Sequence, residues 1–444
     1  MTPGKFAYDS GRSMPLRRAA LIIPALFAAI GAPQTQPFAS KFDFGAASAA
    51  PGYTNVLATT VYSDDLGYGF EPGAKLVGVH RGGGDPLRDD FITSEAPFYF
   101  SVKVPEEGNY KVTVTLGDRE AESVTTVKAE LRRLMLERVR LAPGKFETQS
   151  FIVNVRTPQI PGDGQVGLKD REKTSEARAW DDRITLEFSD THPALCALEI
   201  EKVDGIPTIF IAGDSTSTDQ PFEPYNSWGQ MLTRFFKPDI AIANHGESGE
   251  MLRSFMSELR LAKVLSAIKP GDYLFIQMGH NDQKETGEGV GAFTSYKSDL
   301  KIFVAEARRH DAIPVLVTSM NRLTFDAAGK ITNSLGDYPE AVRQVAKEEN
   351  VTLIDLNAMS KLFYEALSPT DAHLAFAATD TTHHSDYGSY ELAKCIVEGI
   401  RQSRLPLVKY LFDTPPFDPS HPDPFARFDL PPDPAATAQR PYGQ

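Results

Sequence analysis

Cysteine is scarce in this sequence, since only Cys196 and Cys395 occur among its 444 residues. A disulfide framework is therefore excluded; a single bridge is possible, but two buried free thiols are the simpler expectation. The sequence also lacks a Cys/His cluster with zinc spacing and a glycine-rich loop that would cradle phosphate. We therefore predict that the protein uses no metal and no other cofactor.

Positive charge is in deficit, with 46 Lys and Arg against 59 Asp and Glu and a net charge of -13. Nucleic acid and anionic lipid bind basic faces, so the composition argues against both as main partners. Near the start, Arg17-Arg18 precede one apolar run, Ala19 to Ala32. This run is too short for a membrane span and is typical of a secretory signal, with a buried core helix as the alternative. We expect residues 1–40 to be a targeting segment and the mature protein to be secreted or periplasmic, not membrane-bound.

The length of the chain favours two domains. The sequence between residues 41 and 204 indicates β structure. Short apolar-polar alternations separated by turns predict an antiparallel β-sandwich; they fall at residues 42–44, 98–104, 110–116, 151–155 and 184–188. Loop aromatics such as Tyr68, Phe70 or Trp180 allow a carbohydrate-binding role. A scaffold packed on a catalytic domain is the alternative, and we favour it slightly.

From residue 205 to 412 continuous apolar runs alternate with helical patterns, which predicts an α/β domain with a doubly wound parallel sheet. The expected strands are residues 209–212, 240–243, 273–278, 314–318 and 352–356, and the expected helices lie near 228–236, 252–268, 293–310, 338–349 and 388–402. Residues 413–444 are rich in proline and predict an extended or disordered C-terminal arm.

The stretch from Thr208 to Asp219 organises this second domain. Apolar residues run into Gly213-Asp214-Ser215, and a helical pattern follows Pro224, so the stretch predicts a buried strand, a tight turn and a helix. The turn presents Ser215 at the carboxyl end of a central strand, where α/β sheets bind ligands and where the next helix would direct its N–H groups. Taken alone, Asp214, Ser215 and Thr216 are more typical of turn formers and helix caps than of a catalytic site.

Three further polar groups stand at comparable junctions. Strand two runs into Asn244 to Gly249, strand three into Gly279-His280-Asn281-Asp282, and the last helix follows Asp380-Thr381-Thr382-His383-His384-Ser385. Parallel strands place their carboxyl ends on one edge, so these groups should converge on Ser215. Each one singly is typical of a cap or a turn, but the combination favours catalysis.

The converging residue types meet the needs of acyl transfer. Ser215 would be the nucleophile, His383 the base, and Asp380 the carboxylate that orients the imidazole. The N–H groups of Ser215 and Gly249 and the side-chain amide of Asn281 would stabilise the oxyanion. Gly246 is a rival for the oxyanion glycine.

These four groups closely resemble the four blocks of the SGNH (GDSL-like) hydrolases, specifically the rhamnogalacturonan acetylesterase-like branch. The resemblance covers residues 207–403, and Trp228-Gly229-Gln230, Arg253-Ser254-Phe255 and Gly336-Asp337-Tyr338-Pro339 share it. It implies a flavodoxin-like α/β/α fold, no metal, and removal of O-acetyl groups from plant cell-wall polysaccharide or oligosaccharide by a secreted enzyme. The β-rich half resembles the galactose-binding-like domains that some of these esterases carry.

The resemblance leaves the substrate open. It implies substrate contacts for five side chains: Asp214, Trp228, His280, Arg322 and His384. Glu250 stands where the branch commonly has a basic residue at the crevice edge, which keeps acetylxylan or another hemicellulose as an alternative to an acidic galacturonan. A lipase or thioesterase is a competitor among enzymes, although no long apolar lid is evident. A noncatalytic carbohydrate-binding protein is the alternative of another class.

Overall fold

The computed structural model describes residues 38–45, 48–162, 164–433, 437 and 439–441. Most of the predicted targeting segment therefore lies outside the described residues. Its last two positions belong to the first strand, β1, which spans Ala39–Phe44. Residues 37–444 form one compact unit.

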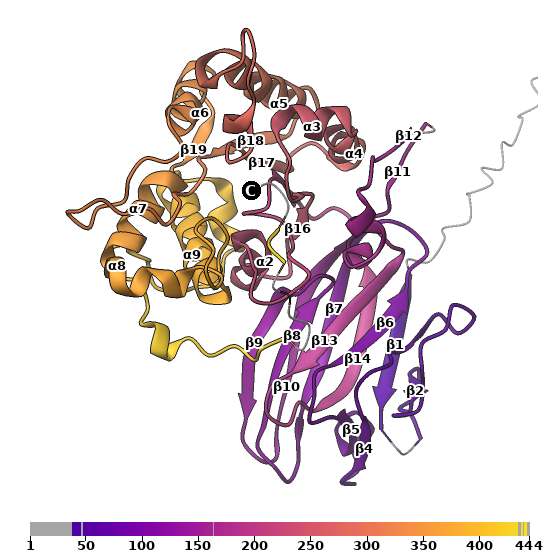
Figure 1. Ribbon diagram of the computed structural model, residues 1–444. Helices are drawn as coiled ribbons and strands as arrows, with labels where there is room; N and C mark the ends of the chain where they lie inside the picture. Colours follow the sequence, from indigo (N-terminus) through magenta and orange to yellow (C-terminus); the bar gives the residue numbers. More distant parts are fainter. Residues whose placement is uncertain (1–37, 46–47, 163, 434–436, 438, 442–444) are drawn as a thin grey trace, which may run out of the picture. The chain divides into compact units, whose positions relative to one another are not determined.

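The N-terminal part is a β-sandwich of two sheets, as the alternating segments predict (Figure 1). One sheet has the order β10-β7-β14-β1-β2, with β5 and β4 beside β14, and the other has the order β3-β6-β13-β8-β9. The first sheet comprises β1, β2 (Thr54–Val56), β4 (Val77–His80), β5 (Asp90–Thr93), β7 (Gly108–Asp118), β10 (Lys145–Val155) and β14 (Leu195–Lys202). The second comprises β3 (Tyr68–Phe70), β6 (Phe98–Lys103), β8 (Ser123–Ala129), β9 (Arg133–Leu141) and β13 (Arg183–Ser189).

Inward-facing residues of both sheets bury an aromatic core between them. Phe100 lies within 5.3 Å, ring centre to ring centre, of Phe42, Phe44 and Phe70. The side chain of Phe70 is therefore buried, and Trp180 is buried as well, with its Nε1 donating to Glu172 Oε1 at 2.9 Å. The expectation that these two aromatics present themselves to a sugar is wrong, because each is used for packing. Tyr68 is half-buried.

Short elements complete this part of the chain. They are α1 (Pro86–Asp89), the hairpin β11 (Gln159–Ile160) and β12 (Gly164–Gln165), and the 3-10 turns η1 (Asp170–Lys173) and η2 (Ala177–Ala179). The two cysteines are free and buried, Cys196 in β14 and Cys395 in the last long helix. The expectation of two buried thiols is confirmed.

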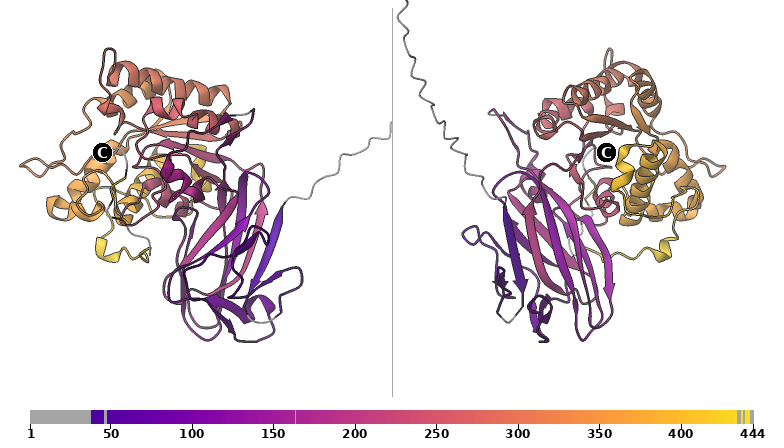
Figure 2. Two further views of the ribbon diagram at one scale, coloured as in Figure 1. Left: turned by 45° about the vertical axis from the view of Figure 1, so that its right-hand side comes forward. Right: turned by 180° about the vertical axis from the view of Figure 1, so that it is seen from behind.

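The second part is a five-stranded parallel sheet with the order β16-β15-β17-β18-β19 (Figure 2). Its strands are β15 (Thr208–Gly213), β16 (Ala241–Asn244), β17 (Tyr273–Gln277), β18 (Ile313–Val317) and β19 (Thr352–Ile354). In chain order this is 2-1-3-4-5, the flavodoxin-like arrangement, and the predicted fold class is confirmed. The strand order changes direction beside β15, so the residues that follow β15 occupy the ligand-binding edge.

Alternate residues of the central strand face two separate apolar layers. Ile209 and Ile211 pack with α2, α7 and α9, whereas Phe210 and Ala212 pack with α3, α4, α5 and α6. The helices are α2 (Trp228–Leu232), α3 (Leu252–Ser257), α4 (Arg260–Ala267), α5 (Lys297–Arg309), α6 (Tyr338–Glu348), α7 (Leu356–Ala366), α8 (Ser368–Asp371) and α9 (Asp386–Gln402). Shorter turns are η3 (Thr233–Phe235), η4 (Asp282–Lys284), η5 (Ala292–Tyr296), η6 (Ala372–Ala375), η7 (Pro406–Tyr410) and η8 (Phe425–Arg427). A layer of helices therefore covers each face of the sheet.

Two helix predictions need correction. The expected helix over 252–268 is two helices, because Leu259 has a left-handed backbone with φ 61° that ends the first and starts the second. Helix α7 was not predicted, since its first residue was assigned to strand five. Asp355 ends that strand early by accepting a hydrogen bond from Ala358 N at 3.2 Å as the helix N-cap.

The proline-rich arm is ordered where it is described. Phe417, Phe428 and Leu430 pack against the catalytic-domain core, and Tyr387 of α9 contacts the rings of Phe425 and Phe428. Hydrophobic contacts with α9 therefore hold an arm that has little regular secondary structure.

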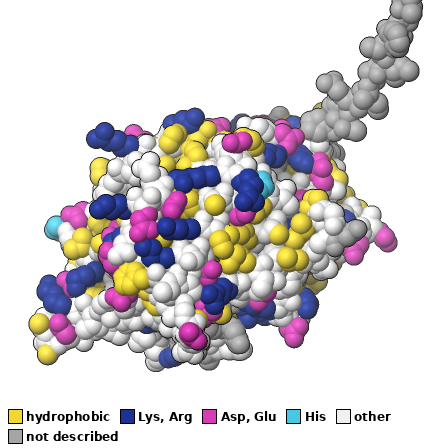
Figure 3. Space-filling model, turned by 90° about the horizontal axis from the view of Figure 1, so that it is seen from above, with side chains coloured by type: hydrophobic (Ala, Val, Ile, Leu, Met, Phe, Trp, Pro, Cys, Tyr) yellow, Lys and Arg dark blue, Asp and Glu magenta, His cyan; other side chains and the backbone are white. Residues whose placement is uncertain are grey.

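The two parts share a polar interface. Arg133 Nε donates to Asp219 Oδ2 at 2.6 Å, Gln230 Nε2 to Leu131 O at 2.7 Å, and Thr233 Oγ1 to Leu134 O at 2.7 Å. On the face seen in Figure 3, basic and acidic side chains are interspersed among the described residues. That face lacks the broad basic patch that nucleic acid requires.

Candidate active site

The turn after β15 presents Ser215. Asp214 shapes it from both ends: its carbonyl accepts from Ser217 N and Thr218 N, both at 3.0 Å, and its Oδ1 accepts from Thr216 N at 2.9 Å. A Cβ on Gly213 would lie 1.9 Å from Ser217 Oγ, so only glycine fits before this turn. The helix α2 begins at Trp228, where the sequence predicts it, and Ser227 caps its first turn. That its N-terminus faces Ser215 stays a prediction.

Three side chains from two distant segments form a continuous hydrogen-bonded chain. Ser215 Oγ lies 2.8 Å from His383 Nε2, and His383 Nδ1 lies 3.0 Å from Asp380 Oδ2. Nucleophile, base and orienting carboxylate of a serine hydrolase are related in this way. All three side chains are buried, with Ser215 3% exposed.

Asp380 is held as a carboxylate. Burial alone would raise its pKa, but His383 and the backbone N–H groups of Thr382, at 2.7 Å, and His383, at 3.1 Å, lower the pKa well below the usual range. Hydrogen bonds to the charged form favour it. The charged form of Asp380 is therefore favoured, and it can hold His383 in one orientation.

Hydrogen bonds link the loop of the predicted oxyanion donors to Ser215. Gln220 Nε2 donates to Ser215 O at 2.7 Å and to Ser248 Oγ at 3.4 Å, and Asn281 Nδ2 donates to Glu250 O at 3.0 Å. These contacts tie the loop that carries Gly249 to Ser215 and to Asn281. Gly249 has φ 84°, a conformation that suits glycine.

Gly246, the alternative oxyanion glycine, already takes part in other hydrogen bonds. Gly246 N donates to Asn244 Oδ1 at 3.1 Å, and its carbonyl accepts from Thr218 Oγ1 at 2.7 Å. Its N–H is therefore engaged in holding the turn, and the geometry favours Gly249 as the oxyanion glycine.

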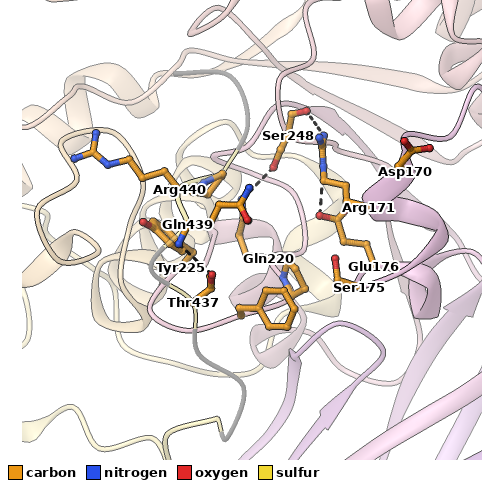
Figure 4. A pocket seen from close by; sticks show the side chains of 13 residues that line it. Asp170, Arg171, Ser175, Glu176, Gln220, Tyr225, Ser248, Thr437, Gln439 and Arg440 are labelled. Carbon is orange, nitrogen blue, oxygen red and sulfur yellow. Dashed lines mark hydrogen bonds and ion pairs between the residues drawn. The ribbon is translucent and has the colours of Figure 1, made fainter.

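A cavity of about 320 Å³ adjoins these residues (Figure 4). Its lining includes Gln220, Tyr225 and Ser248 from the catalytic domain, Arg171 and Glu176 from the β-domain, and four residues of the C-terminal arm, Thr437, Gln439, Arg440 and Pro441. The Tyr225 ring stands edge-on to His383 with 6.0 Å between ring centres. The cavity therefore lies next to the hydrogen-bonded chain and is within the size range of small-ligand sites.

Four of the five predicted substrate contacts are interior residues. Asp214 and His280 face each other, with 3.4 Å between Oδ2 and Nδ1, and His280 Nε2 lies 3.1 Å from Met320 O. Trp228 Nε1 donates to Gln277 Oε1 at 2.9 Å, and His384 Nε2 lies 2.6 Å from Tyr364 Oη. Each of the four is at most 2% exposed. The structure corrects these four assignments, because the side chains support the turn and the core.

Arg322 is the fifth, and it is only partly buried. Its Nε donates to Thr382 Oγ1 at 3.2 Å, next to His383, and its Nη2 donates to His280 O at 3.3 Å. This places a guanidinium group beside the loop that carries the base. Substrate contact by Arg322 stays a prediction.

Glu250 does not stand at a crevice edge. It is fully buried and pairs with Lys169 Nζ, while Ser254 Oγ donates to its Oε2 at 2.6 Å. A buried, paired carboxylate cannot repel an acidic polysaccharide, so the expected argument against galacturonan does not hold.

Sequence patterns predicted the C-terminal arm, but they did not predict that the arm and other residues outside the motifs lie next to the catalytic base. Arg440 Nη2 donates to Thr379 O at 2.7 Å, and Arg440 Nε lies 3.9 Å from Asp380 Oδ2. Neither Tyr225 nor Arg440 belongs to a recognisable motif, and the arm reaches the site only through tertiary contacts. No local signal could have indicated them.

The adjacent histidines offer a matched pair of substitutions. His383→Ala should lower kcat by about 10⁴-fold or more at nearly unchanged stability, since it removes the base. His384→Ala should lower the free energy of unfolding by about 2 to 4 kcal/mol and leave kcat within a few-fold, because His384 is buried against Tyr364 and Phe376. Acetate release and urea unfolding of both variants test this, and the reverse ranking would contradict it.

The raised pKa of Asp282 predicts that the free energy of unfolding depends on pH. Burial first, and then the charge of Asp214, raise its pKa to about 7. A carboxyl group whose pKa is higher in the folded than in the unfolded protein adds to the free energy of unfolding while it is protonated. This contribution is complete below the pKa in the unfolded protein, near 3.9, and it is lost as the pH rises through about 7. Asp282→Asn keeps an acceptor for Leu252 N, which donates to Oδ1 at 2.9 Å, without the charge.

The free energy of unfolding of Asp282→Asn minus that of the wild-type protein should therefore increase by about 2 to 3 kcal/mol between pH 5 and pH 8, because only the wild-type protein loses stability over this range. Urea titrations at the two pH values measure this difference. Asp337→Asn, at an exposed position, is the control and should show no such change. An Asp282→Asn curve parallel to that of the wild-type protein would contradict the prediction.

The fold and the site define an SGNH-type hydrolase domain joined to a galactose-binding-like β-domain. Residues 211–389 match the GDSL-like lipase/acylhydrolase family, and residues 40–147 match the β-agarase/YXIM esterase-like, galactose-binding-domain-like family. The chain belongs to the GDSL-like lipase/acylhydrolase family, and it is a carboxylic ester hydrolase.

Among individual proteins, the chain is similar to rhamnogalacturonan acetylesterase RhgT of Bacillus subtilis, with 38% identity over 218 residues that cover 46% of this chain and 93% of the relative. The uncharacterized esterase YxiM of the same organism is 28% identical over 386 residues, which cover 83% of this chain and 92% of the relative. The crystal structure of protein YxiM from Bacillus subtilis aligns with a TM-score of 0.46 and 25% identity, covering 83% of this chain and 99% of that chain.

None of the helices in the described part of the chain is long and apolar enough to cross a membrane. Among the same residues, no group of three or more His, Cys, Asp or Glu side chains could hold a metal ion.

Proposed function

We propose that the protein removes O-acetyl groups from an acetylated plant cell-wall polysaccharide, with rhamnogalacturonan as the substrate. The observation that carries the catalytic part is the continuous chain from Ser215 Oγ through His383 to Asp380, with links of 2.8 and 3.0 Å. The 38% identity to an enzyme named a rhamnogalacturonan acetylesterase supports the substrate. Export of the enzyme to reach such a polymer is part of the proposal, based on the apolar run after Arg17-Arg18.

The mechanism we propose has two acyl-transfer steps. Ser215 Oγ attacks the acetyl carbonyl carbon while His383 Nε2 takes the hydroxyl proton, and the tetrahedral oxyanion is held by the Ser215 and Gly249 N–H groups and the Asn281 amide. Collapse breaks the ester bond and returns the proton from His383 to the sugar oxygen. Water then attacks acetyl-Ser215 with His383 again as base, which releases acetate and restores the serine.

The substrate is tested by acetate release from a panel of acetylated rhamnogalacturonan, acetylxylan and a small aryl acetate. Rhamnogalacturonan should give the highest kcat/KM among the polymers. A higher value on acetylxylan would support the hemicellulose alternative and overturn the pectin assignment. Hydrolysis of the aryl acetate alone would indicate an esterase for another class of ester.

A further inference from the structure

Two cations from the β-domain bind the backbone of the oxyanion loop. Lys169 Nζ donates to the Ser248 carbonyl oxygen at 3.1 Å, and Arg171 Nη2 donates to the same oxygen at 2.6 Å. Figure 4 shows the Arg171 side chain directed at Ser248 from the β-domain side of the cavity. Both residues belong to or adjoin η1, which lies between strands β12 and β13 of the sandwich.

The contacted carbonyl belongs to the peptide unit that carries the Gly249 N–H. The Ser248–Gly249 peptide is trans, so its C=O and its N–H point in opposite directions. Cations that hold the oxygen on the β-domain side therefore direct the N–H to the opposite side. Ser248 is bridged to Ser215 through Gln220, and the next residue, Glu250, accepts from Asn281.

The same cations fix the loop on both sides of this peptide. Arg171 Nη2 pairs with Glu247, and Lys169 Nζ pairs with Glu250, so the residues before Ser248 and after Gly249 are both tied down. The cluster also includes Glu176, 3.4 Å from Arg171, and Arg260, 3.5 Å from Glu250, so its cations are matched by carboxylates. Its effect on chemistry has to come through the orientation and polarisation of the peptide.

The β-domain turn is itself rigidly attached. Glu172 of η1 is 1% exposed and accepts from Arg260 of α4 through two nitrogens, at 2.9 and 2.6 Å. It also accepts from Trp180 Nε1 at 2.9 Å. A bidentate pair of this kind fixes geometry as well as contact, so Lys169 and Arg171 reach Ser248 from a held position.

We infer that Lys169 and Arg171 are positioning residues for the oxyanion hole, acting through the Ser248 carbonyl on the Gly249 N–H. The β-domain is then part of the catalytic apparatus and does more than bind sugar or pack as a scaffold. The inference rests on the proposed serine mechanism. Preorganised donors lose catalytic value when their orientation relaxes, which is why contacts on the far side of the peptide matter.

The test is hydrolysis of a small aryl acetate, which cannot use an extended sugar-binding surface. The double variant Lys169→Met with Arg171→Met should show kcat lowered by about tenfold, part of what a lost oxyanion donor costs, with KM within about twofold. Lys173→Met is the matched control: it removes a cation of the same turn that pairs with exposed Asp170. Its kcat should equal that of the wild-type protein.

Removing both cations takes an ion-pair partner from buried Glu247 and leaves Glu250 with Arg260, at 3.5 Å, and the Ser254 hydroxyl, which threatens folding. The charge-balanced variant therefore adds Glu247→Gln and Glu250→Gln to the double variant. We expect near wild-type unfolding behaviour with kcat still about tenfold low, whereas Lys169→Arg alone should retain kcat within about twofold. The pH profile of kcat/KM should keep its shape in all folded variants, because His383 and Asp380 are untouched.

A charge-balanced variant with wild-type kcat would overturn the inference, as would a raised KM at unchanged kcat. Should that variant fail to fold, Lys169→Met with Glu250→Gln and Arg171→Met with Glu247→Gln are measured separately, and wild-type kcat in both would equally overturn the inference. Ser215→Ala separates the two proposals. Activity in Ser215→Ala refutes the serine mechanism, whereas an inactive Ser215→Ala beside a fully active charge-balanced variant refutes only the positioning role.

Discussion

Ser215→Ala should abolish measurable ester hydrolysis, with kcat lowered by about 10⁵-fold or more, in a protein that remains folded. The hydroxyl lies 2.8 Å from His383 Nε2 and is the group that would form the proposed acyl-enzyme. Its loss leaves that nitrogen without its serine partner, a cost to stability of about 1 kcal/mol. Removal of the nucleophile of a serine hydrolase has the full catalytic effect of removing the triad.

The measurement is acetate release over long incubations, with thermal unfolding recorded for the same samples. Ser217→Ala is the matched control, since Ser217 is also buried in this turn and its Oγ donates to Asp214 O at 3.2 Å. It should retain most of the activity. Residual turnover by Ser215→Ala above about one part in a thousand would refute the proposed mechanism.

Asp380→Asn should lower kcat by about 10⁴-fold without unfolding the protein. The asparagine oxygen can still accept from Thr382 N and His383 N, so the loop geometry should persist. Its amide nitrogen would donate to His383 Nδ1, which favours the imidazole tautomer with its proton on Nε2. In that tautomer Nε2 cannot accept the proton of the nucleophile. The charge that stabilises the imidazolium is lost at the same time.

Steady-state kinetics and urea unfolding of Asp380→Asn provide the check. Asp371→Asn, at an exposed position in α8, removes a nearby carboxylate and should leave kcat unchanged. A loss of less than tenfold in Asp380→Asn would mean that Asp380 does not control the imidazole. Restoration of activity at high pH would mean that its role is limited to setting the protonation of His383.

Local pattern was sufficient for most of the sheet. The continuous apolar run at Ile209 to Ala212 is buried on both faces, and the structure places it in an interior strand of the five, between β16 and β17. Local pattern was insufficient at Leu356, because this apolar residue follows a strand but is the first residue of helix α7. The N-cap Asp355 decides that boundary through one side-chain hydrogen bond, which composition does not reveal.

The resemblance to a family predicted the right blocks but assigned some of their residues to the wrong environment. Trp228 and His384 were expected at the substrate because they stand near the blocks in sequence. Their burial shows that a residue next to a functional group along the chain is as often its support. Glu250 was misjudged for the same reason, because its partner Lys169 lies 81 residues away.

By itself the sequence determined the two kinds of domain, the order of the strands and the four polar groups that meet at one sheet edge. Periodicity is a local property, and parallel strands bring their carboxyl ends together whatever the loops contain. Only the tertiary structure decided which side chains face the cavity, that Arg440 of the arm lies beside Asp380, and that β-domain cations hold the Ser248 carbonyl. Those contacts join residues 61 to 79 positions apart, and they depend on how packed surfaces meet in three dimensions.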